Sequence, residues 1–184
     1  MKVEYTSLNG VICLSPARFE DHRGFFSESY SRLRMAEHGI TTDFVQDNHS
    51  LSREVGTVRG LHFQSPPHAQ AKLVRCGKGA LFDVAVDIRR GSPTYGQWVG
   101  EELSFENGKQ LLVPEGFLHG FITLQPDTEI IYKCSDYYAP ECDGAVHWNS
   151  CGIDWKFGGT PILSSKDAAA PALADFVSPF VFEE

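Results

Sequence analysis

The sequence lacks both a paired cysteine motif and a long apolar run. Its five cysteines, an odd number, include no C-x-x-C pair, which argues against a disulfide framework and a structural zinc site and favours a reducing compartment. The first ten residues, MKVEYTSLNG, contain no apolar signal core, and no apolar run approaches membrane-spanning length. We therefore expect a cytoplasmic protein with no membrane partner.

Positive charge is also scarce. The chain has 16 Lys and Arg against 24 Asp and Glu, a formal net charge of -8, with no basic run of the kind that nucleic-acid-binding proteins show. We expect no nucleic-acid partner. A few converging Arg and Lys side chains could still bind a small anionic ligand.

The length of 184 residues fits a single domain over residues 1–184, with room for an arm or tail. The clearest periodicity runs from Gly79 to Ile88 and has period two, as in a strand with one fully apolar face. That face consists of Phe82, Val84, Val86 and Ile88. Further strand-like segments are Thr57–Gln64, Lys72–Cys76, Gln97–Ser104, Gln110–Val113, Phe117–Leu124 and Glu129–Ser135. Many short strands separated by Gly and Pro turns predict a β-sandwich, a jelly roll or a small barrel.

Helix is expected in only two places. Ser31 to His38 reads as one short helix closed by Gly39, and Ser164 to Asp175 as a turn or two interrupted by Pro171. The segment from Asp136 to Gly159 is rich in Gly and Cys and is predicted to form long loops.

Two histidines stand in motifs that could carry chemistry. His62 lies in Arg59–Gln64 after Gly60, and strict strand alternation would place Arg59 and His62 on opposite faces. Both reach one pocket only if Gly60 forms a bulge or Arg59 curls around a sheet edge. His119 ends the run Pro114-Glu115-Gly116-Phe117-Leu118-His119, a P-x-G-x-x-H pattern that matches the second half of the cupin signature. A buried structural histidine is the competing interpretation of His62.

The cupin interpretation raises the question of a metal. Metal-binding cupins usually carry an H-x-H pair and a Glu in their first motif, whereas here His62 is followed by Phe63 and Gln64. Two isolated imidazoles make a poor three- or four-ligand site. We therefore favour histidines that act as acids and bases and expect no metal, with a metal-dependent cupin as the alternative.

Other polar residues occupy positions suited to a binding pocket. Tyr132 lies on the strand-like Glu129–Ser135 and could donate a proton from inside a barrel, although a core tyrosine is the simpler interpretation. A scattered set of cations and amides could bind an anion, or could be ordinary surface groups. Its members are Arg23, Gln46, Asn48, Arg59, Lys72 and Lys166.

Taken together, these segments resemble the dTDP-4-dehydrorhamnose 3,5-epimerase family of the cupin superfamily. The resemblance runs from near Asp21 to near Asp167, in the family's order. The matching stretches are 21–28, 44–50, 58–64, 69–75, 82–89, 92–98, 114–121, 132–133 and 163–167. The fold implied is mainly β, a cupin-type jelly-roll barrel with an N-terminal arm and short C-terminal helical segments.

The resemblance also implies a reaction. The substrate would be the dTDP-linked 4-keto-6-deoxyhexose dTDP-4-dehydro-6-deoxy-D-glucose, epimerised at C3 and C5 to dTDP-4-dehydro-L-rhamnose for dTDP-L-rhamnose biosynthesis. This reaction includes no redox step and implies that no cofactor is needed. By position, His62 is similar to the family's general base and Asp167 to its orienting carboxylate. Lys72 is similar to the group that stabilises charge on the C4 oxygen, and Tyr132 to the acid on the opposite face.

The remaining family positions concern binding and assembly. His119 would line the sugar pocket, and the arm would take part in a homodimer. Positions similar to the family's substrate contacts are Arg23, Phe26, Glu28, Gln46, Asn48, Arg59, Tyr138, Asp143 and Lys166. Two departures affect loop geometry: Asp143 replaces the usual Glu, and Ser150 replaces an acidic residue in a loop that looks shortened.

Two further functions remain open at the level of sequence. A related epimerase could act at C3 alone or at C5 alone, because the sequence does not settle how many carbons react. A non-catalytic cupin could bind a sugar nucleotide with the same cations and without using His62 or Tyr132.

Overall fold

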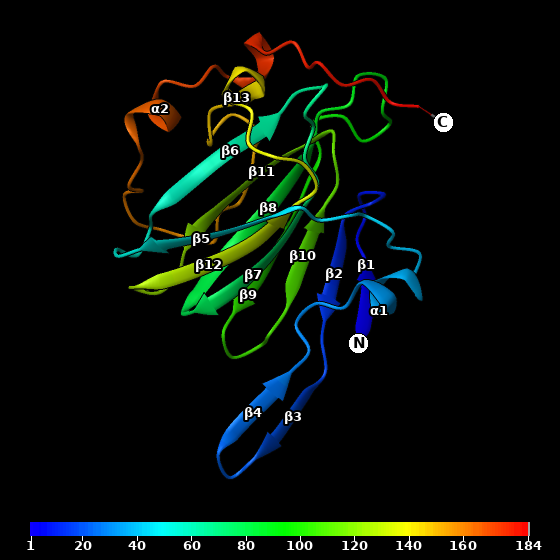
Figure 1. Cartoon of the computed structure of the whole chain (residues 1–184). Helices are drawn as coiled ribbons and strands as arrows, with labels where there is room; N and C mark the ends of the chain where they lie inside the picture. Colours follow the sequence, from blue (N-terminus) through cyan, green and yellow to red (C-terminus); the bar gives the residue numbers. More distant parts are fainter. Residues whose placement is uncertain (184) are drawn as a thin grey trace.

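The chain folds mainly into two antiparallel β-sheets that pack face to face, and the computed structural model describes residues 1–183 (Figure 1). The first sheet has six strands in the order β1-β2-β10-β7-β12-β5, and the second has five in the order β13-β6-β11-β8-β9. The first comprises β1 (Lys2–Tyr5), β2 (Ile12–Ser15), β10 (Gln110–Val113), β7 (Lys72–Lys78), β12 (Thr128–Cys134) and β5 (Gln46–Ser52). The second comprises β13 (Asp143–Ala145), β6 (Val58–Gln64), β11 (Phe117–Thr123), β8 (Ala80–Asp87) and β9 (Trp98–Ser104). The predicted mainly-β, cupin-type jelly roll is confirmed.

Strand β8 explains how this sandwich is built, because every one of its residues is buried. Phe82, Val84 and Val86 pack into an apolar cluster on the outer side of the five-stranded sheet. Leu81 and Ala85 point the other way, into the core between the two sheets. The outer face is covered by the segment after β13, which the sequence predicted to be loops and which buries Val146, Ile153 and Trp155, among others, against the sheet.

A separate two-stranded hairpin, β3 (Arg18–Asp21) and β4 (Gly24–Ser27), projects from the sandwich as the N-terminal arm (Figure 1). Its aromatic side chains are largely uncovered: Phe19 is 65% exposed and Phe26 68% exposed. Large exposed aromatic groups on a projecting element are typical of a surface that contacts another molecule.

The predicted helices are short, as expected. α1 (Arg32–Ala36) begins after Ser31, whose hydroxyl caps it, and α2 (Ser165–Ala168) begins after Ser164, capped in the same way. Two 3₁₀ turns, η1 (Pro140–Cys142) and η2 (Leu173–Asp175), complete the described elements. No helix within residues 1–183 is long and apolar enough to cross a membrane.

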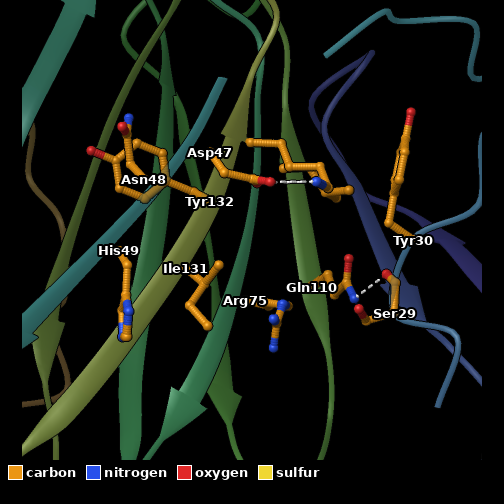
Figure 2. A pocket seen from close by; sticks show the side chains of 11 residues that line it. Ser29, Tyr30, Asp47, Asn48, His49, Arg75, Gln110, Ile131 and Tyr132 are labelled. Atoms are coloured by element: carbon orange, nitrogen blue, oxygen red, sulfur yellow. Dashed lines mark hydrogen bonds and ion pairs between the residues drawn. The ribbon is translucent and has the colours of Figure 1, made fainter. Parts of the chain in front are cut away.

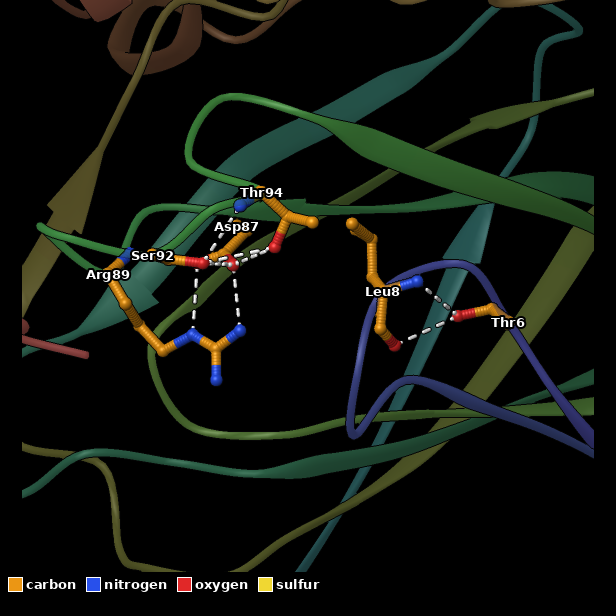
Figure 3. Close-up of polar contacts among 6 residues, drawn as sticks. All are labelled: Thr6, Leu8, Asp87, Arg89, Ser92 and Thr94. Carbon is orange, nitrogen blue, oxygen red and sulfur yellow. Dashed lines mark hydrogen bonds and ion pairs between the residues drawn. The ribbon is translucent and has the colours of Figure 1, made fainter. Parts of the chain in front are cut away.

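Hydrogen bonds to a buried carboxylate hold the connection between β8 and β9 in place (Figure 3). Asp87 accepts hydrogen bonds from Arg89 Nε at 3.0 Å and Nη2 at 2.7 Å, from Ser92 Oγ at 2.6 Å and from Thr94 Oγ1 at 2.7 Å. Burial alone would raise the pKa of this carboxyl, but the donors from Arg89, Ser92 and Thr94 outweigh burial and lower the pKa from 3.8 to about 2.

This network predicts a pH-dependent contribution to stability. Because the pKa of Asp87 is lower in the folded state, its contribution is present above pH 3.8 and is lost as the pH falls through about 2. We expect Asp87→Asn to reduce the free energy of unfolding at neutral pH by about 2–3 kcal/mol. Urea unfolding measured at decreasing pH should show the difference in free energy of unfolding between wild type and Asp87→Asn becoming smaller. Asp21→Asn, which removes an exposed pair with Arg23, is the control and should behave as wild type.

Candidate active site

A groove enters the sandwich between the two sheets. One part is a cavity of about 400 Å³, and an adjoining hollow of about 500 Å³ shares His62, Lys72, Tyr132 and Lys166 with it. We call the two together the groove. Its walls come from both sheets and from the segment 162–167, which carries α2.

A bulge in β6 brings Arg59 and His62 into the same cavity. His119 of β11 pairs with His62 and Phe121 pairs with Arg59, so β6 has one residue more than β11 between these pairs. Gly60 has φ 133°, and a Cβ there would lie 2.6 Å from the Cα of Gly120. Only glycine fits this position, and of the two arrangements that the sequence left open, the structure has the bulge at Gly60.

His62 is held by a carboxylate that lies far away in the sequence. Its Nε2 is 2.6 Å from Oδ1 of Asp167, which is 3% exposed. The backbone N–H of Asp167 donates to Ser164 Oγ at 3.1 Å, so the cap of α2 fixes the carboxylate. Burial lowers the pKa of His62, and this effect outweighs the opposite effect of Asp167. The ring is therefore neutral at neutral pH, with one nitrogen engaged and the other available as a base.

Lys72 and Tyr132 face this histidine from the other sheet. Lys72 opens β7 and pairs with Cys134 of β12, two residues beyond Tyr132. Burial lowers the pKa of Lys72 and raises that of Tyr132, because both lose solvation of their charged forms. The groove thus has an imidazole on one wall and an amine and a phenol on the opposite wall.

A second histidine–carboxylate pair lies beside the first. His119 Nε2 is 2.8 Å from Oδ1 of Asp83, and both residues are buried. The sequence placed His119 in the pocket, and it does line the cavity. Asp83 was not recognised as a site residue, although a charge on the inward face of a buried strand needs a partner. That requirement is the signal that could have identified it.

Most of the expected binding residues lie along the adjoining hollow. Gln46, Asn48, Tyr138, Asp143 and Lys166 all line it. Lys166 forms an ion pair with Asp143, so the shorter carboxylate at position 143 still reaches its partner. Arg59, which lines the cavity, is braced by Ser52 Oγ at 3.2 Å.

Three expected binding residues lie elsewhere. Arg23 and Phe26 are on the projecting arm and Glu28 follows it, and none of them lines the groove of their own chain. Arg23 pairs with Asp21, and Glu28 accepts from Arg34 Nε at 2.8 Å. The structure therefore does not bring these three together with His62 within one chain.

The described side chains favour acid–base chemistry at this groove. Among residues 1–183, no three or more His, Cys, Asp or Glu side chains are grouped so that they could hold a metal ion. His62 and His119 are each engaged by their own carboxylate. The arrangement can accept a proton from one side of a bound molecule and return one from the other.

Comparisons with known proteins agree with this chemistry. Residues 5–175 match the family model of dTDP-4-dehydrorhamnose 3,5-epimerase. The enzyme of that name from Salmonella typhimurium is 53% identical over 176 residues, covering 94% of this chain and 96% of the relative.

Two solved structures extend the similarity to the whole fold. The epimerase from Bacillus anthracis, solved with TDP and PPi bound, has a TM-score of 0.90 at 49% identity and covers 94% of this chain and 99% of its own. The epimerase from Legionella pneumophila, in complex with dTDP-4-keto-L-rhamnose, has a TM-score of 0.91 at 46% identity and covers 96% of this chain and 94% of its own.

The cupin-type sandwich and its groove of acid–base groups are those of a carbohydrate epimerase. Within that class, the match over residues 5–175 and the similarity to full-length relatives show that the chain belongs to the dTDP-4-dehydrorhamnose 3,5-epimerase family.

Proposed function

We propose that the protein converts dTDP-4-dehydro-6-deoxy-D-glucose to dTDP-4-dehydro-L-rhamnose by inverting C3 and C5. The observation that carries this proposal is the 2.6 Å contact between His62 and Asp167 in a groove whose opposite wall presents Lys72 and Tyr132. The C4 ketone acidifies the hydrogens on both neighbouring carbons, so one set of groups can serve both positions.

Each inversion divides into two proton transfers. The free nitrogen of His62 takes the proton from carbon, and the electron pair moves to the C4 oxygen as an enolate. Lys72 stabilises the negative charge on that oxygen, and Asp167 stabilises the imidazolium. Tyr132 then gives its hydroxyl proton to the opposite face of the carbon. Each acid–base group contributes about 10²–10⁴-fold to the rate.

The proposed reaction moves protons only. No electrons leave or enter the substrate, and its own ketone supplies the electron sink. We therefore propose that the enzyme uses no cofactor and no metal.

The adjoining hollow is the proposed site for the nucleotide diphosphate. Lys166 supplies positive charge there in an otherwise acidic chain, and Gln46, Asn48 and Tyr138 supply polar contacts. Arg59 adds positive charge from the neighbouring cavity. The TDP and pyrophosphate held by the Bacillus anthracis relative support this assignment.

We also propose that the protein acts as a homodimer in the cytoplasm. A second copy would accept the exposed arm, so that Arg23, Phe26 and Glu28 complete the partner's groove. The outer face of the six-stranded sheet adds a half-buried hollow of about 430 Å³, lined by Tyr30, Arg75 and Ile131 among others, that a second copy could cover (Figure 2). The five free, buried cysteines are compatible with a reducing compartment.

Incubation with substrate in D₂O tests the reaction. We expect deuterium at both C3 and C5 of the product, read carbon by carbon by NMR, because each inversion returns a proton that equilibrates with solvent. Deuterium at one carbon only would identify a single-site epimerase instead. If neither carbon exchanges, the protein binds sugar nucleotides without catalysis and the proposal fails.

A further inference from the structure

Asn48 lies directly opposite the proposed acid. Strand β5 pairs with β12 so that Asn48 faces Tyr132 and Gln46 faces Cys134. Directly paired residues of an antiparallel sheet project to the same side, with Cβ atoms about 4.5–5.5 Å apart. Figure 2 shows the Asn48 amide next to the Tyr132 ring.

A chain of hydrogen bonds fixes which way this amide points. The backbone N–H of Tyr138 donates to Gln46 Oε1 at 3.2 Å, and Gln46 Nε2 donates to Asn48 Oδ1 at 3.0 Å. Asn48 Nδ2 donates to Cys134 Sγ at 3.6 Å. Because the amide oxygen already has a donor and a backbone N–H anchors the chain, the Asn48 nitrogen is directed toward Cys134 and Tyr132.

We propose that Asn48 is a positioning residue that donates to the Tyr132 phenol oxygen and so keeps the hydroxyl proton free for the substrate. The inference rests on the proposed function and assigns to Asn48 a role other than nucleotide contact. It depends on orientation: an amide oxygen in the same place would accept the hydroxyl proton and withhold it.

The proton balance shows why a donor is needed there. When Tyr132 protonates the enolate carbon, its O–H bond breaks, a C–H bond forms and a phenolate remains among buried groups. The second N–H of Asn48 can stabilise that phenolate, and the hydrogen bond from Asn48 lowers the pKa of Tyr132 against the raising effect of burial. Water then returns a proton to the phenolate and removes one from the His62 imidazolium.

Asn48→Asp tests the proposal. A carboxylate at position 48 can still accept from Gln46 but also accepts the Tyr132 hydroxyl proton. His62 would continue to remove a proton and return a deuteron to the same face in D₂O, which gives exchange without inversion. We expect the ratio of inversion to exchange at C3 and at C5 to fall by about 10- to 100-fold. The ratio is read from one sample, so changes in substrate affinity do not affect it.

A second variant changes the orientation of the Asn48 amide without replacing Asn48 itself. In Gln46→Glu the carboxylate can only accept, so it draws Asn48 Nδ2 toward itself and turns Oδ1 toward Tyr132. We expect the same fall in the ratio. Asp154→Asn is the control, because Asp154 pairs with Lys156 on the surface and lines neither the groove nor the hollow proposed for the dimer, so it should leave the ratio unchanged.

The outcomes separate the inference from the function on which it rests. If Asn48→Asp or Gln46→Glu reduces exchange and inversion in proportion, Asn48 has no specific effect on the acid and the inference is overturned. If the wild-type protein shows no exchange at all, the proposed function fails instead. Should Asn48→Asp not fold, Gln46→Glu alone decides.

Discussion

His62→Gln is expected to reduce both deuterium exchange and epimerisation by about 10²–10⁴-fold, at C3 and C5 alike. Without the imidazole, the groove has no neutral base beside Asp167. Glutamine is the most informative replacement because its amide nitrogen can occupy the position from which Nε2 donates to Asp167. The buried carboxylate therefore keeps a hydrogen-bond partner. The loss then reports on proton abstraction rather than on folding.

Two further variants test the interpretation of this result. Asp167→Asn leaves the imidazole in place but removes the charge that orients it and stabilises its protonated form, so it should also lose most activity. His68→Asn is the control: His68 contacts Asp136 at 3.0 Å in a similar histidine–carboxylate pair, and it does not line the groove. The proposed mechanism is wrong if His62→Gln retains wild-type exchange while binding substrate normally.

The central strands could be predicted because their sequence follows the two faces of a sheet. β8 is the clearest case: its period-two pattern placed Phe82 and Val84 on one face, and both lie together in the outer cluster. The sequence could not show that this outer face is covered. Its cover consists of single apolar residues such as Val146 and Trp155 in a segment with no period of its own.

Strands β3, β4, β5 and β13 escaped prediction for a related reason. β3 and β4 are exposed along most of their length, and β5 reads Gln-Asp-Asn-His-Ser-Leu-Ser with only its last residue buried. A strand without an apolar face is specified by its neighbours in the sheet rather than by its own residues. β13 has three residues, too few for any period to show.

The candidate site also has features that the sequence indicated and features that it did not. A bulge at Gly60 was one of two arrangements that the residues themselves allowed if Arg59 and His62 were to share a pocket, and the structure has it. The partnership of His62 with Asp167 came only from family resemblance, since 105 positions separate the two residues. Asp83 was missed because its side chain reads as the polar half of an alternating strand until its burial is seen.

Mixing two inactive variants is expected to restore activity if the arm completes the partner's groove. One variant is His62→Gln, with a damaged groove and an intact arm. The other is the double variant Arg23→Ala, Phe26→Ala, with an intact groove and a damaged arm. In a two-fold dimer the same contact occurs twice, so each arm serves the other subunit. A mixed dimer then holds one groove with both defects and one with neither.

Random pairing of equal amounts should leave about one groove in four intact. Activity should therefore rise to about a quarter of wild type after the subunits exchange, from the much lower level of either variant alone. The control mixture is His62→Gln with Asp167→Asn, whose defects fall in different grooves of the mixed dimer but disable both. Differently tagged subunits that co-purify establish that mixed dimers formed. If they form and activity stays at the level of the separate variants, the arm does not complete the partner's groove. Only an arm that serves the other subunit places both defects in one groove and leaves the second groove intact.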